Sequence, residues 1–341
     1  MTATPLTTPA YSSDRTGVVW AYRFAPGAPG VQINAEEALT VAAHPDGARF
    51  DKFVWLHFDL TNVAAERTLR ERLDLPNAFF AGLEEQSRST QIEHSGDGLV
   101  AVVNDVLFDF RFEATQVSTL LVAVDRRRVV TARRKPLRSV DRLRTAVREG
   151  EGFDSPTSLL VHLLRDQADV LVAIVRDATA RIDHIEDTFL AKRLDIRRAD
   201  LGALRRVLVR LRRLLAPEPA TLFRLLNRPP KWIAEDDRVA LRQSTEEFAA
   251  VLNDVAALLE RSKLLQEEIA AKVNEQSNRF LLLLSIVTVI GLPFTMIGGL
   301  FGMNVGGIPF GEHPRGFWII VALVAIATGA LVWLLLRMRR L

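Results

Sequence analysis

Hydrophobic and polar positions alternate differently in successive parts of the chain. Between about Gly17 and Thr131 the apolar residues form short runs, rich in β-branched and aromatic side chains and bounded by Gly, Asp or Asn. Such runs are typical of strands, which we expect at 18–22, 53–58, 99–103, 119–124 and 128–131. Thr61-Asn62 predicts the cap of a helix over 64–73. Residues 17–150 are therefore expected to form a mixed α/β domain.

From residue 151 the spacing becomes helical. Ser155 can cap a helix whose first position is Pro156, and apolar residues recur at helical spacing as far as Phe189. Neither Pro nor Gly appears between Pro156 and Gly202, so this pattern predicts one helix of roughly forty residues. A second helix is expected over 199–215. Breaks are predicted at Pro217, Pro219, Pro229 and Pro230, and residues 151–230 form a segment of long helices.

A third helix is expected to begin at Glu235-Asp236-Asp237, because acidic residues suit the positive end of a helix dipole. Its apolar stripe runs in steps of three and four, which favours packing against other helices, copies of itself included. The stripe is Phe248, Leu252, Val255, Leu259, Leu265, Ile269 and Val273. No breaker follows it, so we expect the stalk, 231–279, to continue directly into the next apolar segment.

Two uncharged apolar runs, 280–300 and 317–336, close the chain. At about 1.5 Å per residue each spans roughly 30 Å, the thickness of the bilayer's hydrocarbon core. Two such runs are hard to bury as core helices in a domain of this size, which favours membrane spans. Arginines flank them, in the tail 337–341 and at Arg279, whereas the loop 301–316 has little positive excess. Both termini are therefore expected in the cytoplasm of a multi-pass inner-membrane protein.

Composition narrows the function classes. The 341 residues include no cysteine, which excludes disulfides and thiolate metal sites, and the net charge of +3 is weak support for nucleic-acid binding. Residues 1–16 lack a signal-peptide pattern and are expected to form a disordered tail. With no Walker loop, nucleotide fingerprint or hydrolase constellation, we expect neither an enzyme nor a nucleotide partner, and no cofactor.

One face of the first apolar run carries small and polar residues. Steps of three and four place on that face Asn278, Leu281, Ser285, Thr288, Leu292, Thr295 and Gly299. Hydroxyls and bare glycine backbone could contact the hydration shell of a cation, but the same residues also permit close packing between membrane helices. The pattern alone leaves both readings open. Pro293 is expected to kink or reshape this helix, and two helices cannot enclose a polar path without further copies.

The run ends in Gly302-Met303-Asn304, followed by Val-Gly-Gly-Ile-Pro. Here the sequence resembles the CorA family of divalent-cation transporters, which carries Gly-Met-Asn at the end of the first of two C-terminal membrane helices. The continuation is most similar to the ZntB, or zinc-transporter, branch. The layout of the whole chain fits this resemblance. Asn304 offers an amide carbonyl that can hydrogen-bond the water shell of an ion.

The resemblance implies a funnel-shaped homopentamer in a lipid membrane, with divalent cations (Zn²⁺, Mg²⁺, Co²⁺) as substrates. It implies an Asn304 ring at the pore entrance, Thr295 and Gly299 below it, apolar constrictions near Leu292 and Leu281, and a polar ring at Asn278. Pore lining then becomes the favoured interpretation of the whole face. It also implies proton-coupled zinc transport as an option. The acid that magnesium-type members carry after the motif is missing here, which favours zinc over a Mg²⁺/Co²⁺ channel.

Other polar residues have two interpretations. Glu312 and His313 could attract cations at the outer loop, or be a solvated loop. Glu267, Glu268 and Glu275 could concentrate cations on the stalk, or pair with neighbouring Lys and Arg. A metal role for Asp183, His184, Glu186 and Asp187, and a binding role for the arginines between 205 and 213, are weaker than a solvated helix face. A membrane-anchored sensor without transport remains an alternative, although it needs neither the polar face nor the amide ring.

Overall fold

The computed structural model of the chain describes residues 13–43, 52–84, 90–191, 198–303 and 313–338. The chain separates into two compact units, residues 1–265 and 266–341. Most of the expected tail, 1–12, lies outside the described residues. Residues 13–16 instead belong to an ordered turn, because the Asp14 carboxylate accepts hydrogen bonds from the backbone N–H groups of Thr16 and Val18.

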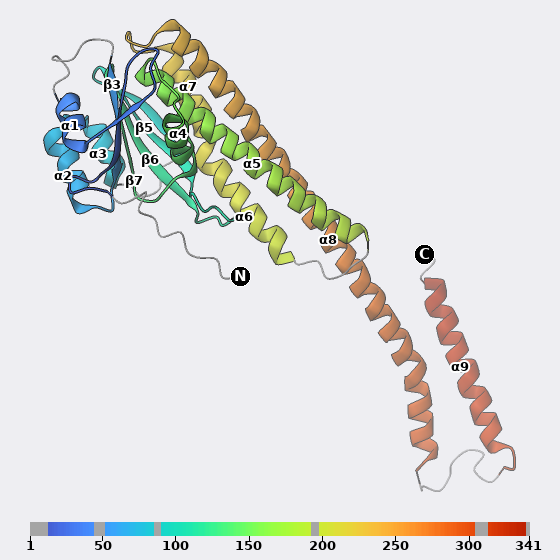
Figure 1. Cartoon of the computed structure of the whole chain (residues 1–341). Coiled ribbons are helices and arrows are strands. Elements are labelled where there is room, and N and C mark those ends of the chain that lie inside the picture. The colour runs from blue at the N-terminus through green and yellow to red at the C-terminus, as the bar shows by residue number, and fades with distance from the viewer. Residues whose placement is uncertain (1–12, 44–51, 85–89, 192–197, 304–312, 339–341) are drawn as a thin grey trace. The chain divides into compact units, whose positions relative to one another are not determined.

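Within the described part of the first unit, seven strands form one sheet in the order β2-β1-β3-β7-β6-β5-β4 (Figure 1). Their bounds are β1 Val18–Phe24, β2 Val31–Ile33, β3 Phe53–Asp59, β4 Gln91–Ser95, β5 Gly98–Val106, β6 Val117–Val124 and β7 Arg128–Arg133. Neighbouring strands are antiparallel except β3 and β7, which pair in parallel at the centre of the sheet. Each expected strand is present, and β2 and β4 are additional.

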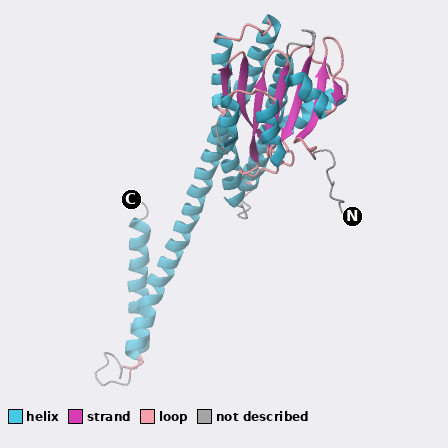
Figure 2. Cartoon of the chain, turned by 90° about the vertical axis from the view of Figure 1, so that its left-hand side faces the viewer, coloured by secondary structure: helices cyan, strands magenta, loops and turns pink. Residues whose placement is uncertain are grey.

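Helices cover both faces of this sheet (Figure 2). The helices of the described chain, in both units, are α1 Ala35–Ala43, α2 Val63–Arg72, α3 Asn77–Glu84, α4 Arg138–Arg148, α5 Pro156–Leu190, α6 Arg198–Leu215, α7 Pro217–Asn227, α8 Glu235–Phe301 and α9 Gly316–Met338. Successive strand residues point to opposite faces, so β3 sends Trp55 to the core under α4, α5 and α7, and Leu56 to the core under α1, α2 and α3. The sheet is the middle layer of an α/β/α sandwich, which confirms the mixed α/β prediction.

The predicted helix starts are confirmed by their caps. Asn62 is the N-cap of α2, and its side-chain oxygen accepts a hydrogen bond from the Ala64 N–H at 2.9 Å. Ser155 begins α5 in a reciprocal capping box with Ser158, with Pro156 in the first turn. Side-chain acceptors at these positions satisfy backbone donors that the helix itself cannot.

The predicted ends of two helices agree with the structure. The helix after Ser155 has 35 residues, slightly fewer than the roughly forty expected, and ends at Leu190, one residue beyond the last apolar position of its predicted stripe. Pro217 marks a break as predicted, because α6 ends at Leu215 and a new helix, α7, opens at Pro217, where a missing N–H costs nothing. Leu222, Leu225 and Leu226 of α7 then pack into the sheet core. By contrast, α8 runs unbroken for 67 residues, as the absence of a breaker before 280 predicted.

Candidate ion-conducting helix

The predicted polar face lies on the C-terminal third of α8, in the second unit. All seven of its residues, from Asn278 to Gly299, are solvent-exposed in the single chain. Leu281 and Leu292 are 58 % and 61 % exposed, although both are large and apolar. No residue of the most apolar 18-residue window of α8 is buried. This surface therefore requires lipid or further protein copies to cover it.

The hydroxyl groups on this face are oriented by the helix backbone. Ser285 Oγ donates to the Leu281 carbonyl and Thr288 Oγ1 to the Leu284 carbonyl, each at 2.9 Å. Thr295 Oγ1 contacts the carbonyls of Gly291 and Leu292 at 3.2 and 3.0 Å. A hydroxyl whose proton is used in this way keeps its lone pairs outward. The face thus presents oxygen acceptors, which are the ligands that cations and their bound waters need.

Glycines on α8 point to the same conclusion. A Cβ added to Gly291, Gly298 or Gly299 would meet nothing within 4 Å in the chain. Packing within the subunit therefore does not explain their lack of a side chain. Because Gly lowers helix stability by about 1 kcal/mol relative to Ala, we attribute their presence to a surface that the single chain does not contain.

The motif residues at the end of α8 are only partly described. Gly302 keeps a helical hydrogen bond to the Gly298 carbonyl at 2.9 Å, and a Cβ there would lie 3.0 Å from that same oxygen. Glycine at position 302 thus allows the backbone to lie close to the preceding helical turn. Met303 is 52 % exposed. Asn304, the proposed entrance residue, lies outside the described residues, as does Glu312.

Pro293 does not end the helix. It has no N–H for the carbonyl four residues earlier, that of Val289, so this oxygen lacks its helical donor. His313 has a local structural role, since its Nδ1 accepts from the Arg315 N–H at 3.2 Å and its carbonyl accepts from the Gly316 N–H that begins α9.

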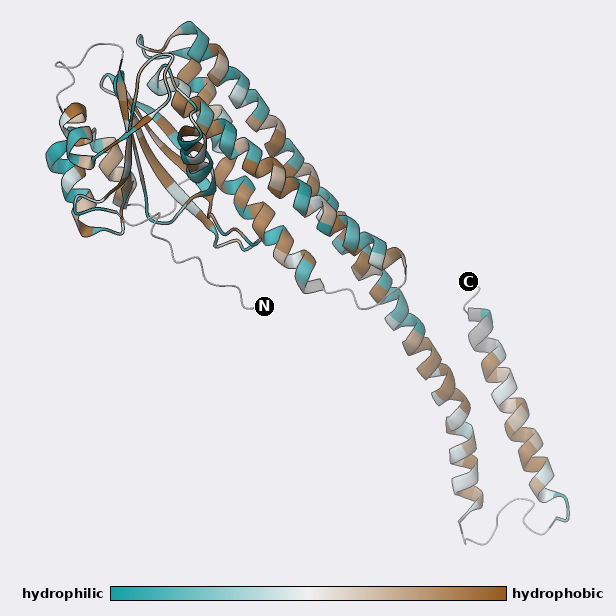
Figure 3. Cartoon of the chain, in the orientation of Figure 1, coloured by the Kyte–Doolittle hydropathy of each residue, from teal (hydrophilic) through white to brown (hydrophobic). Residues whose placement is uncertain are grey.

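Among the described residues, two helices are long and apolar enough to cross a membrane, α8 in its final part and α9 over Gly316–Trp333, and Figure 3 shows both stretches as largely hydrophobic. In α9, Val324 and Thr328 are buried while Phe317, Trp318 and Trp333 are exposed. Aromatic residues near the ends of an apolar helix are typical of the two membrane–water interfaces.

Glu275 of the stalk and two acidic residues of α5, Asp183 and Glu186, are paired with cations. Glu275 lies between Lys272 at 3.0 Å and Arg279 at 2.6 Å, and the Lys272 hydrogen bond holds the pKa of Glu275 below its usual value. The Arg261 guanidinium of α8 lies 2.7 Å from Asp183 and 2.5 Å from Glu186. In the described part of the chain no three acidic or histidine side chains converge as a metal site would require. Ion pairing is thus the better interpretation of Glu275, Asp183 and Glu186.

The sheet unit contains buried polar groups that the sequence did not reveal. Glu218 Oε2 accepts from Gln167 Nε2 at 3.1 Å and from Thr90 Oγ1 at 3.2 Å, and burial raises the pKa of Glu218 to about 8. On β5, Asp105 Oδ2 accepts from the N–H and the hydroxyl of Ser139, at 2.9 and 2.5 Å. Asp105 therefore caps α4 from a distant strand, which sequence spacing alone could not show.

His57, on β3, is fully buried. Its ring stacks on Trp20 at 4.1 Å and its Nδ1 lies 2.8 Å from Thr131 Oγ1. Burial, with the charges of Arg133 and Arg144, keeps the pKa of His57 well below its usual value, so the ring stays neutral. This agrees with a role in the core of the sheet.

The sequence also matches a known family over most of its length. The family model for CorA-like Mg²⁺ transporter proteins covers residues 50–339. The chain belongs to this family. It is accordingly a CorA-family divalent cation transporter, and the relatives it matches are transporters rather than enzymes.

Individual relatives agree with this assignment. The zinc transport protein ZntB of Pectobacterium carotovorum is 27 % identical over 306 residues, which cover 90 % of this chain and 93 % of that protein. The divalent cation transporter CmaX of Pseudomonas aeruginosa is 28 % identical over 333 residues, 96 % of this chain and 98 % of CmaX. The solved full-length CmaX has a TM-score of 0.78 at 25 % identity, covering 97 % of this chain and 100 % of CmaX. The CorA magnesium transporter of Methanocaldococcus jannaschii shares the fold, with a TM-score of 0.70 at 17 % identity, covering 92 % and 96 % of the two chains.

Proposed function

We propose that this chain carries Zn²⁺ across a membrane through a central pore lined by the exposed face of α8. The observation that carries the proposal is the row of back-bonded hydroxyls on that face, whose oxygen lone pairs point away from the helix. Neutral oxygens can bind the water shell of a hydrated ion without holding it too tightly to leave. Zinc is preferred because curated relatives are zinc transport proteins and because no acid directly follows the motif.

The pore requires several copies of the chain. The face repeats in alternating steps of three and four, a mean of 3.5 residues, and a repeat of this kind favours a left-handed supercoil of identical helices. Together with the open space beside Gly298 and Gly299, it supports a homo-oligomer, which we propose to be a pentamer. Asn304 would then form a ring at the outer mouth, while Leu292 and Leu281 narrow the path.

The proposed topology places both termini in the cytoplasm of the inner membrane, with α9 beside lipid and the loop 301–316 outside. This orientation is supported by the near-neutral loop and by Arg279, Arg337, Arg339 and Arg340. Neither apolar run, 280–300 or 317–336, contains a carboxylate or histidine. If zinc is coupled to protons, the proton carrier must therefore be His313, Glu312 or a stalk acid.

Flux through the purified protein tests the proposal. The full chain is reconstituted in liposomes, and entry of Zn²⁺, Mg²⁺, Co²⁺ and protons is followed in parallel with ion-selective dyes. Zinc-dependent flux that is absent from empty liposomes is expected. Flux of Mg²⁺ and Co²⁺ without Zn²⁺ would replace the zinc assignment with a CorA-type channel. Absence of every cation flux from a correctly oriented oligomer would favour the membrane-anchored sensor.

A further inference from the structure

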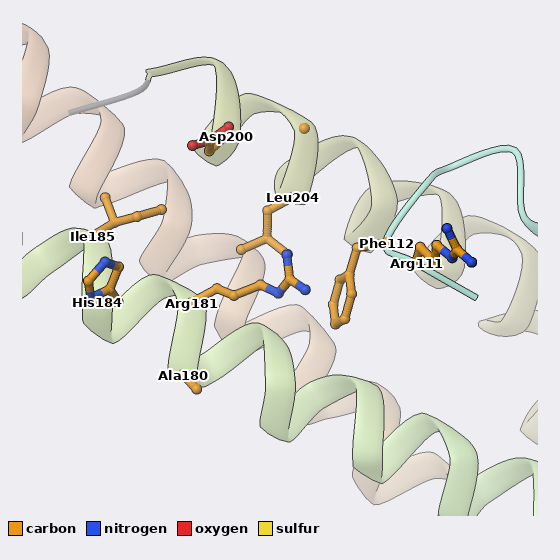
Figure 4. A pocket seen from close by; sticks show the side chains of 9 residues that line it. Arg111, Phe112, Ala180, Arg181, His184, Ile185, Asp200 and Leu204 are labelled. Atoms are coloured by element: carbon orange, nitrogen blue, oxygen red, sulfur yellow. The ribbon is translucent and has the colours of Figure 1, made fainter. Parts of the chain in front are cut away.

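A pocket of about 450 Å³ opens on the first unit, between α5, α6 and the loop that joins β5 to β6 (Figure 4). This volume lies within the usual range for small-molecule sites, about 300–1,000 Å³. Apolar side chains, including Phe112, Ile185 and Leu204, line part of the pocket. The polar part is made by Arg111, Arg181, His184 and Asp200.

The cationic side of the pocket is built around Phe112. The Arg181 guanidinium lies over the Phe112 ring, 4.1 Å from its centroid. A guanidinium held by its face leaves its N–H edge free for a planar oxyanion, which it can bind through two parallel hydrogen bonds. Arg111 precedes Phe112 and also lines the pocket, but its side chain extends away from Arg181 on the other side of the Phe112 ring (Figure 4). It therefore adds a second positive charge at the rim of the pocket.

The loop that presents these side chains has a fixed and unusual conformation. Phe112 has φ = 63°, and no other non-glycine residue in the described part of the chain has a positive φ. Gln116 Oε1 holds the loop by accepting from the Arg111 N–H at 2.6 Å. An aromatic side chain does not stabilise a positive φ, so the backbone at Phe112 is strained. Strained residues of this kind cluster at ligand sites.

The charged side chains that line the pocket do not pair with oppositely charged groups in the described part of the chain. Among the described residues, Arg111, Arg181, His184 and Asp200 make no side-chain ion pair, whereas nearby Asp183 and Glu186 both pair with Arg261. Two guanidinium groups disfavour a bound metal cation. Asp200, on α6, can accept a hydrogen bond from a donor on the ligand.

From these observations we infer that the pocket binds a small organic anion, with a carboxylate or phosphate held by Arg181 and with Arg111 adding positive charge at the rim. Its flat apolar body lies against Ile185 and Leu204, and a hydrogen-bond donor at its other end meets Asp200. A ligand in this position joins the β5–β6 loop to α5 and α6. The site is separate from the α8 face, and it is independent of which ion the protein carries.

Binding to the full-length protein in detergent tests the inference by calorimetry and thermal shift. The probes are 4-aminobenzoate and AMP, which carry a carboxylate or a phosphate on a flat body, and inorganic phosphate, which has no body. We expect saturable binding of at least one organic probe, with phosphate weaker. Arg181→Gln should weaken binding roughly tenfold or more, the cost of a lost charge-assisted hydrogen bond, whereas Arg111→Gln, which removes only charge at the rim, should weaken it less. Ala203→Trp, which fills the pocket and leaves its charge unchanged, should abolish it.

The matched control is Arg176→Gln, an exposed arginine of α5 that does not line the pocket; it should leave binding unchanged. The inference is overturned if neither organic probe saturates below about 10 mM. It is equally overturned if phosphate binds as tightly as the organic probes, or if Arg176→Gln weakens binding as much as Arg181→Gln. None of these measurements depends on cation flux, so a failure of the transport proposal would be seen separately.

Discussion

The buried carboxyl of Glu218 makes the stability of the sheet unit depend on pH. Its pKa rises from the ordinary 4.5 to about 8, chiefly because burial penalises the charged form, with the Asp105 charge adding to the rise. In the unfolded chain the carboxyl ionises near pH 4.5, whereas in the folded chain it keeps its proton to about pH 8. Between these values the unfolded state binds fewer protons, so stability falls as pH rises.

The size of the effect follows from the same two values. Each pH unit above 4.5 costs about 1.4 kcal/mol of unfolding free energy, so the group lowers stability at pH 7 by at most about 3 kcal/mol. Glu218→Gln keeps the shape of the protonated acid and cannot ionise. We expect the variant to match the wild type near pH 5 and to unfold several degrees higher at pH 8, since 1 kcal/mol shifts the Tm of a domain this size by about 2–4 °C.

The assay is thermal unfolding of the full chain in detergent, followed by tryptophan fluorescence, because Trp20 and Trp55 are buried in this unit. Glu246→Gln, an exposed carboxylate on α8, is the matched control and should not change the pH profile. A Tm difference between Glu218→Gln and wild type that is the same at pH 5 and pH 8 would refute the reasoning. So would a variant that is less stable than the wild type at pH 8.

The remaining predictions concern the pore and the packing of the helices. Asn304→Ala should nearly abolish zinc uptake in liposomes with the oligomer intact by native mass spectrometry; unchanged uptake would remove the amide ring from the entrance. Leu292→Ala should raise cation flux severalfold by widening a constriction, while Leu283→Ala, equally exposed but off the polar face, should not. Asp105→Ala should cost about 1–3 kcal/mol, because the α4 donors lose their buried acceptor, and a Tm unchanged from wild type would contradict this. Arg261→Ala should change stability by less than about 1 kcal/mol in thermal unfolding, because its ion pairs are 40–49 % exposed.

Periodic and local signals could be predicted from the sequence. The caps at Asn62 and Ser155 depend on a few adjacent residues, and the unbroken α8 depends only on the absence of breakers. Each was therefore visible without tertiary information. Likewise the exposed face of α8 follows from spacing alone, although its role in a pore stays a proposal.

Features that join distant segments could not be predicted in this way. Asp105 caps α4 from 34 positions away, and Glu218 is buried by α5 and by the residue that precedes β4. The pocket needs Phe112 beside Arg181, two residues with no common sequence pattern.

The position of β7 in the sheet has a consequence for synthesis of the protein. This strand is the last to leave the ribosome, yet it lies between β3 and β6. Until it emerges, the β1–β3 half and the β4–β6 half have no strand to join them, and β3 and β6 each expose an unpaired edge that can pair with another nascent chain. A chain stalled before residue 128 is thus prone to aggregate, whereas one that has passed residue 133 can close its sheet before either apolar helix has been made.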